Sequence, residues 1–173
     1  QVTQYYVVSL IGKTLVLLIA PINTIVISYL TKRKERLTRS QFGKAVLAGG
    51  GVSLVFFVAC QIGTPLFVWL FYRNLYESVK GIVTVVNLAQ ILGLFSAFLF
   101  ILVLTFTDER WQLWIQLTHF CILLVSSVLA ARTYGMMGFA VASLGANSLR
   151  VAAVVILGIV KAGKDKGDRN ADR

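Results

Sequence analysis

The chain has few charged residues, and acidic residues are especially scarce. Only 14% of its 173 residues are charged, and Asp and Glu together number 7. A soluble domain usually has about a quarter of its residues charged. Apolar residues make up 57% of the chain and gather in runs of roughly twenty or more. This composition is typical of an integral membrane protein and argues against a soluble domain.

The residue types that carry most catalytic and metal chemistry are also scarce. His119 is the only histidine, and Cys60 and Cys121 lie in separate apolar runs without metal-ligand spacing. Every acid lies in a gap between apolar runs or in the C-terminal tail. A carboxylate proton relay or intramembrane cation site needs an acid inside a span. We therefore predict no enzymatic activity, no catalytic residues, no metal site and no cofactor.

Five apolar runs divide the chain. Each is long enough to cross a hydrocarbon core about 30 Å thick as a helix, and in lipid the backbone polar groups must be satisfied within each helix. We predict an all-α polytopic membrane helix bundle over residues 1–160 and a disordered basic tail over residues 161–173. The five predicted transmembrane helices cover approximately residues 5–30, 45–71, 82–106, 113–131 and 138–160.

Lysine and arginine fall unevenly between the two predicted sides. The gap after the first run, the gap after the third run and the tail hold far more cations than the other gaps, which hold Arg73, Lys80 and Arg132. Cytoplasmic gaps carry the excess of Lys and Arg. We therefore place the C-terminus in the cytoplasm and the N-terminus outside. The basic residues of the cytoplasmic side are Lys32, Arg33, Lys34, Arg36, Arg39, Lys44, Arg110, Lys161, Lys164, Lys166, Arg169 and Arg173.

This distribution also explains the net charge of +10. A nucleic-acid partner would favour cations along one folded face, whereas these lie between apolar runs. The basic cluster after the first run is instead expected to contact anionic membrane lipids. The chain starts at a glutamine, and an odd number of spans with an outside N-terminus is unusual for a complete protein. We expect the chain to be part of a larger one.

Two cations interrupt the apolar runs. Lys13 lies about two turns inside the first run, and Arg150 lies near the middle of the fifth. A charge at membrane depth costs about 2.5–3.5 kcal/mol on insertion scales, so it usually faces protein or a water-filled cavity. Both cations are candidates for contact with an anionic substrate such as a pyrophosphate. The alternatives are a lysine that reaches back to the headgroups and an arginine that bonds to a neighbouring helix.

Uncharged polar residues inside the runs provide four more candidates. They are Asn23, Gln61, Asn87 and Gln90. Such side chains most often join helices by hydrogen bonds, and their alternative role is to line a polar cavity. The two prolines, Pro21 and Pro65, lie inside the first and second runs, where we expect each to kink its helix.

Three stretches together resemble a known family. They are IGTPLFVWLF (62–71), YRNLYESVKG (72–81) and YGMMGFAVASLGANSLR (134–150), the last of which contains Gly135, Gly138 and Ala140 in a G-x-x-G-x-A pattern. The chain resembles the C-terminal part of bacterial polysaccharide exporters, the lipid-linked oligosaccharide flippases. These belong to the same superfamily as the multidrug and toxic-compound extruders.

The resemblance implies one part of a two-lobed transporter in the bacterial cytoplasmic membrane. Such a transporter flips a lipid-diphosphate-linked glycan by alternating access for polysaccharide biosynthesis. Lys13 would lie on the first cavity-lining helix, and the N-terminal lobe of the same protein would be the partner. Two alternatives stay open. One is a multidrug extruder of the same superfamily, and the other is a small five-span scaffold or accessory protein.

Overall fold

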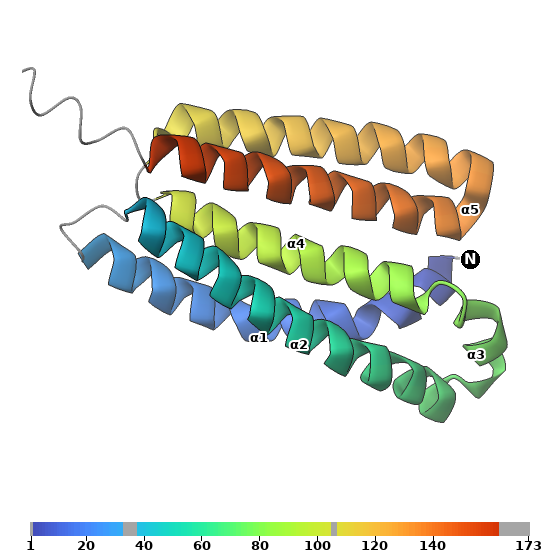
Figure 1. The fold of residues 1–173 in the computed structure, drawn as a ribbon. Helices are drawn as coiled ribbons and strands as arrows, with labels where there is room; N and C mark the ends of the chain where they lie inside the picture. The colour runs from blue at the N-terminus through green and yellow to red at the C-terminus, as the bar shows by residue number, and fades with distance from the viewer. Residues whose placement is uncertain (1, 33–37, 105–106, 163–173) are drawn as a thin grey trace, which may run out of the picture.

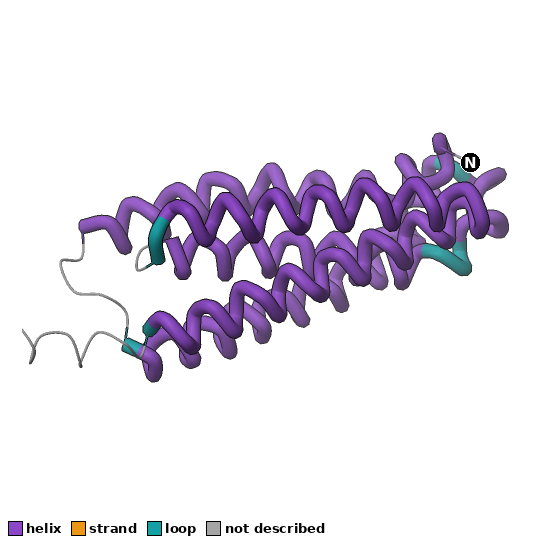
Figure 2. The backbone as a smooth tube through the Cα atoms, turned by 90° about the horizontal axis from the view of Figure 1, so that it is seen from above, coloured by secondary structure: helices purple, strands orange, loops and turns teal. Residues whose placement is uncertain are grey.

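In the computed structural model the long helices lie along one common axis (Figure 1). It describes residues 2–32, 38–104 and 107–162, and within these ranges it contains no strand. Nearly all of this chain is helical, with short connections at the ends of the helices (Figure 2). The elements are α1 (Val2–Lys32), α2 (Arg39–Phe71), α3 (Arg73–Val79), α4 (Val83–Leu104) and α5 (Glu109–Lys161). The predicted all-α fold class is therefore confirmed.

Three helices in the described ranges are long and apolar enough to cross a membrane. They are Arg39–Phe71, Val83–Leu104 and Arg110–Lys161. This supports the predicted membrane class by helix length and composition. The predicted spans 5–30 and 45–71 fall on α1 and α2, and those at 113–131 and 138–160 both fall on α5. The predicted span 82–106 corresponds to α4 (Val83–Leu104), and its last two residues lie outside the described ranges. The number and direction of the crossings remain predictions. The disordered tail cannot be compared, because residues 163–173 lie outside the described ranges, as do residues 33–37.

Helix α5 is two helices joined at a sharp reversal. Gly135 has φ 60° and ψ −138°, values that a residue with a side chain rarely adopts. The first arm, residues 109–134, and the second arm, residues 136–161, therefore run side by side in opposite directions (Figure 1). The turn is tight: a Cβ on Gly138 would lie 2.1 Å from the carbonyl oxygen of Ala130. We call these two segments the arms of α5.

Local capping explains why α2 begins before the predicted apolar run. The Thr38 hydroxyl accepts a hydrogen bond from the Gln41 amide, and the Gln41 side chain accepts one from the Thr38 amide. This reciprocal capping box satisfies two backbone donors that would otherwise lack partners at a helix start. At Pro65, α2 continues on both sides, as α1 does at Pro21.

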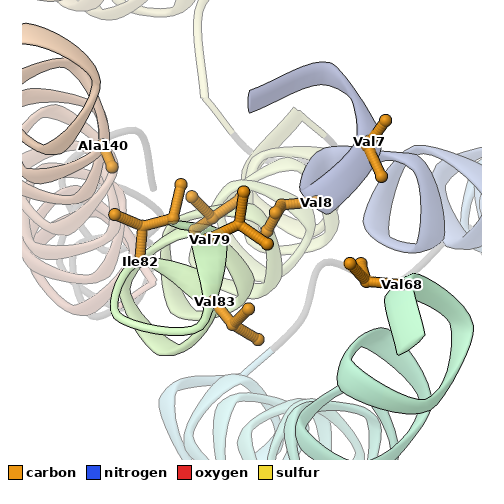
Figure 3. Packing of buried hydrophobic residues seen from close by; sticks show 8 residues of the cluster. Val7, Val8, Val68, Val79, Ile82, Val83 and Ala140 are labelled. Carbon is orange, nitrogen blue, oxygen red and sulfur yellow. The ribbon is translucent and has the colours of Figure 1, made fainter. Parts of the chain in front are cut away.

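Helix α4 is the centre of the bundle. It lies between α5 on one side and α1 and α2 on the other (Figure 1). Two apolar clusters pack around its two ends. The first, near the α4 start, also includes side chains from α1, α2, α3 and α5 (Figure 3). The second, near the α4 end, joins Phe42 of α2 and Val154 of α5 to Leu99, Leu102 and Val103.

The helix ends separate the described cations into two groups. One end of the bundle contains the end of α1, the start of α2, the start of α5 and the end of α5 (Figure 1). We call it the basic end, because its described cations include Arg39, Lys44, Arg110 and Lys161. The opposite end contains the start of α1, the short α3 and the reversal of α5, with Arg73, Lys80 and Arg132.

The reversal gives a direct prediction. We expect Gly135→Ala to lower the free energy of unfolding by about 1–3 kcal/mol, because alanine is strained at this φ and ψ. The measurement is equilibrium unfolding of the purified protein in detergent micelles. Gly145→Ala is the matched control, because Gly145 lies in the same helix with open space around it. It should leave stability unchanged or slightly higher. Equal stability of the two variants would contradict the strained reversal.

Candidate functional site

The structure distributes the six candidate residues over four helices. Lys13 and Asn23 lie on α1, Gln61 on α2, Asn87 and Gln90 on α4, and Arg150 on the second arm of α5. Gln61 and Asn87 are in direct contact. Lys13 and Arg150 lie at different levels of α4. Gly12, next to Lys13, faces Gln90, whereas the Arg150 guanidinium lies at Phe100, about 15 Å further along α4. The two cations therefore do not form one site within this bundle.

Asn87 is a buried link between α4 and α2, with a side chain only 1% exposed. Its Nδ2 donates hydrogen bonds to the Cys60 carbonyl at 3.1 Å and to Gln61 Oε1 at 2.9 Å. Its Oδ1 accepts one from the Thr64 hydroxyl at 3.2 Å. Both amide hydrogens and the amide oxygen thus have partners, as a buried polar group requires.

Gln61 and Gln90 extend these links. Gln61 Nε2 donates to the Thr84 hydroxyl at 2.9 Å, which adds a fourth hydrogen bond between α2 and α4. Gln90 Nε2 donates to the Ser9 carbonyl at 3.2 Å, which joins α4 to α1. Gly12 makes room for Gln90: a Cβ there would lie 2.0 Å from Gln90 Oε1. These contacts fit the interpretation of Gln61, Asn87 and Gln90 as residues that join helices.

The two candidates on α1 have different surroundings. The Lys13 side chain is exposed, and its Nζ lies 4.5 Å from the centroid of the Tyr6 ring, closer to the helix start. This is a cation–π contact that leaves the ammonium accessible. Asn23 lines a largely apolar cleft of about 270 Å³ between α1, α2 and α4. Phe56, Phe95 and Phe98 form part of its wall.

Arg150 is half-buried beside α4. Its guanidinium carbon lies 5.5 Å from the centroid of the Phe100 ring. Its Nε is buried and has no hydrogen-bond partner among the described residues. The side chain also lines a groove of about 380 Å³ between the two arms of α5, together with His119. Arg150 therefore has an aromatic neighbour and an open groove, and it makes no interhelical hydrogen bond in the described ranges.

The sequence did not identify several polar contacts. Thr64 and Thr84 complete the network around Asn87 and Gln61, and their partners are 23 residues away in sequence. His119 Nε2 lies 3.2 Å from Asn147 Oδ1, and Asn147 Nδ2 donates to the Ala89 carbonyl at 2.8 Å. These bonds join both arms of α5 to each other and to α4. A sequence pattern within one helix carries no information on such pairs.

Within the described ranges, no group of three or more His, Cys, Asp or Glu side chains is placed to hold a metal ion. Comparisons of the chain with protein-family models, curated proteins and solved structures find no match. The family resemblance therefore rests on the sequence stretches alone, and the function has to be argued from the residues themselves.

Asn87 offers a test of its structural role. We expect Asn87→Ala to lower the free energy of unfolding by roughly 0.6–2 kcal/mol, the range for interhelical hydrogen bonds in membranes. Equilibrium unfolding in detergent measures the change. Asn74→Ala is the control, since Asn74 is exposed on α3, away from the residues that bond to Asn87. If both variants unfold alike, the network around Asn87 does not stabilise the bundle.

Proposed function

We propose that the chain is part of a non-enzymatic membrane transporter that flips a lipid-diphosphate-linked oligosaccharide across the bacterial cytoplasmic membrane. The observation that carries the proposal is Lys13. It is an exposed cation on an apolar helix, with an aromatic ring as its neighbour. A lysine ammonium is a compact point charge that suits phosphate oxygens. The resemblance to oligosaccharide flippases supports the same assignment.

We further propose five crossings, made by α1, α2, α4 and the two arms of α5. The basic end would then lie in the cytoplasm, and the start of α1 would lie outside. The support is the separation of the described cations between the two ends, since cytoplasmic segments carry the excess of Lys and Arg. The large exposed apolar side chains of α2, which include Leu47, Leu54 and Leu70, suit contact with lipid or another lobe.

Transport by alternating access requires two lobes that rock about a site between them. In this proposal the described bundle supplies one lobe, and the N-terminal lobe of the same protein supplies the other. Lys13 binds the diphosphate on the α1 face. The cleft beside Asn23 has mainly apolar walls and suits a segment of the prenyl chain, with the Asn23 amide available to a sugar hydroxyl.

The proposal does not assign Arg150 to the diphosphate that Lys13 binds. Because the Arg150 guanidinium lies about 15 Å further along α4 than the level of Lys13, one diphosphate cannot contact both cations in this bundle. Gln61, Asn87 and Gln90 have their polar atoms engaged between helices, so they shape the bundle that positions α1. We therefore assign substrate contact to Lys13 and Asn23 and treat Arg150 separately.

Cysteine labelling tests the proposed orientation. In a background with Cys60→Ala and Cys121→Ala, we introduce Asn74→Cys at one end or Ser40→Cys at the basic end. Both native side chains are exposed. A membrane-impermeant maleimide added to intact cells should label the Asn74→Cys protein. The Ser40→Cys protein should become labelled only after the membrane is permeabilised. The reverse pattern would overturn the orientation, and labelling of both would overturn the crossing by α2, which is the helix between the two positions.

Reconstitution tests the transport function. The full protein that contains this chain is placed in proteoliposomes with a fluorescent undecaprenyl-diphosphate-linked glycan. Flipping is followed as the glycan becomes accessible to an impermeant quencher. We expect Lys13→Gln to slow flipping roughly tenfold or more, because a hydrogen bond to a charged group contributes about 1.5–3 kcal/mol. Lys13→Arg should retain much of the rate.

Lys44→Gln is the control for Lys13→Gln, because Lys44 is an exposed cation near the basic end. It should flip at the wild-type rate. A wild-type rate for Lys13→Gln would refute the assignment of the diphosphate to Lys13. Efflux of cationic drugs without glycan flipping would favour the multidrug extruder. Absence of both activities would favour the scaffold alternative.

A further inference from the structure

Arg150 carries a charge that the described bundle does not neutralise. An arginine guanidinium stays protonated at any physiological pH. An ion pair within the described ranges joins Lys80 to Glu77 at the opposite end of the bundle. Arg150 has no acidic partner in these ranges, and its buried Nε has no hydrogen-bond partner there. A buried cation in an apolar setting requires an anion or other acceptors to offset its desolvation.

The side chain is directed toward the basic end. Asn147, about one turn earlier in the second arm, contacts α4 at the Ala89 carbonyl. The Arg150 guanidinium instead lies at Phe100, about one turn before α4 ends at Leu104. The charged group is thus displaced along α4 toward the end where Arg110 and Lys161 lie. This is the geometry of a long cationic side chain that reaches for the headgroup level.

The lining of the groove beside Arg150 extends to Trp111, near the start of α5 at the basic end. The groove lies between the arms of α5, and its volume is about 380 Å³. Trp111 and Trp114 line it from the start of the first arm, and Lys161 Nζ lies 5.9 Å from the Trp111 ring. Tryptophan and lysine are typical of the headgroup level of a membrane. Ala146 and Ala153 line the groove on the side of the second arm, and their short side chains leave space in it.

We propose that this groove binds one anionic phospholipid from the leaflet at the basic end. The lipid phosphate accepts hydrogen bonds from Arg150, and an acyl chain lies along the apolar wall between the arms. Charge complementarity identifies the occupant, because the groove offers Arg150 and the nearby Lys161 and no described carboxylate. The indole rings of Trp111 and Trp114 flank the headgroup. This site is separate from the Lys13 face and does not depend on transport.

Tryptophan fluorescence tests the proposal on the intact protein. The chain has 3 tryptophans, so Trp69→Phe leaves Trp111 and Trp114 as reporters of the groove. The protein is reconstituted in vesicles that contain either brominated phosphatidylglycerol or brominated phosphatidylcholine as the quenching lipid. We expect the apparent affinity for phosphatidylglycerol to exceed that for phosphatidylcholine about fivefold, as one basic contact near a membrane surface provides.

Two variants in the same background locate the site. Arg150→Gln should reduce the ratio of the two affinities to about one. Arg132→Gln should leave it unchanged, because Arg132 lies next to the reversal of α5, at the opposite end of the bundle. Added inorganic phosphate should not compete. Equal quenching by the two lipids in the unsubstituted groove overturns the proposal whether or not the variants fold. Competition by inorganic phosphate also overturns it, because the groove then binds free phosphate.

Discussion

The packing of the bundle depends on one turn of α4, whose polar groups form hydrogen bonds with α1, α2 and α5. Asn87 bonds to α2, Gln90 bonds to α1, and the Ala89 carbonyl accepts from Asn147 of α5. In hydrocarbon, lipid tails offer apolar side chains much the same contact as another helix does. Helix association therefore relies on close packing and interhelical hydrogen bonds. A single turn that bonds to three neighbours fixes how far each helix is rotated and shifted against α4.

Two glycines, one on α1 and one on α4, leave space for these bonds. Gly12 lets α1 approach Gln90 closely. Gly93 of α4 leaves space for the Asn147 side chain of α5, because a Cβ on Gly93 would lie 3.2 Å from Asn147 Nδ2. At the α1–α4 interface and at the α4–α5 interface, a glycine on one helix thus leaves space for a polar side chain of the other helix. The polar groups of α4 join the helices of the bundle, while Lys13 and Arg150 remain available for ligands at two different levels of it. The residues that define the fold are in this way separate from those proposed to meet charged ligands.

The sequence predicted the long helices well because length and hydrophobicity alone determine them in lipid. It placed the second helix from residue 45, whereas the Thr38–Gln41 capping box starts α2 at Arg39. It missed α3, since a seven-residue helix produces no long apolar run. The polar candidates were identified as residues, but their partners were not, because the bonds link helices far apart in sequence. For the same reason the separation of Lys13 from Arg150 along the length of α4 was not predictable.

In the proposed five-crossing topology, the reversal at Gly135 also bears on how the two arms of α5 enter the membrane. The two arms of α5 meet with almost no connecting segment, and Arg132 is the sole charged residue close to the turn. A paired insertion of both arms thus carries one charge and a few short polar groups across the hydrocarbon. Asn147 and His119 reach each other within that pair, so these two polar side chains can be desolvated together. The second arm then enters with part of its hydrogen bonding already complete.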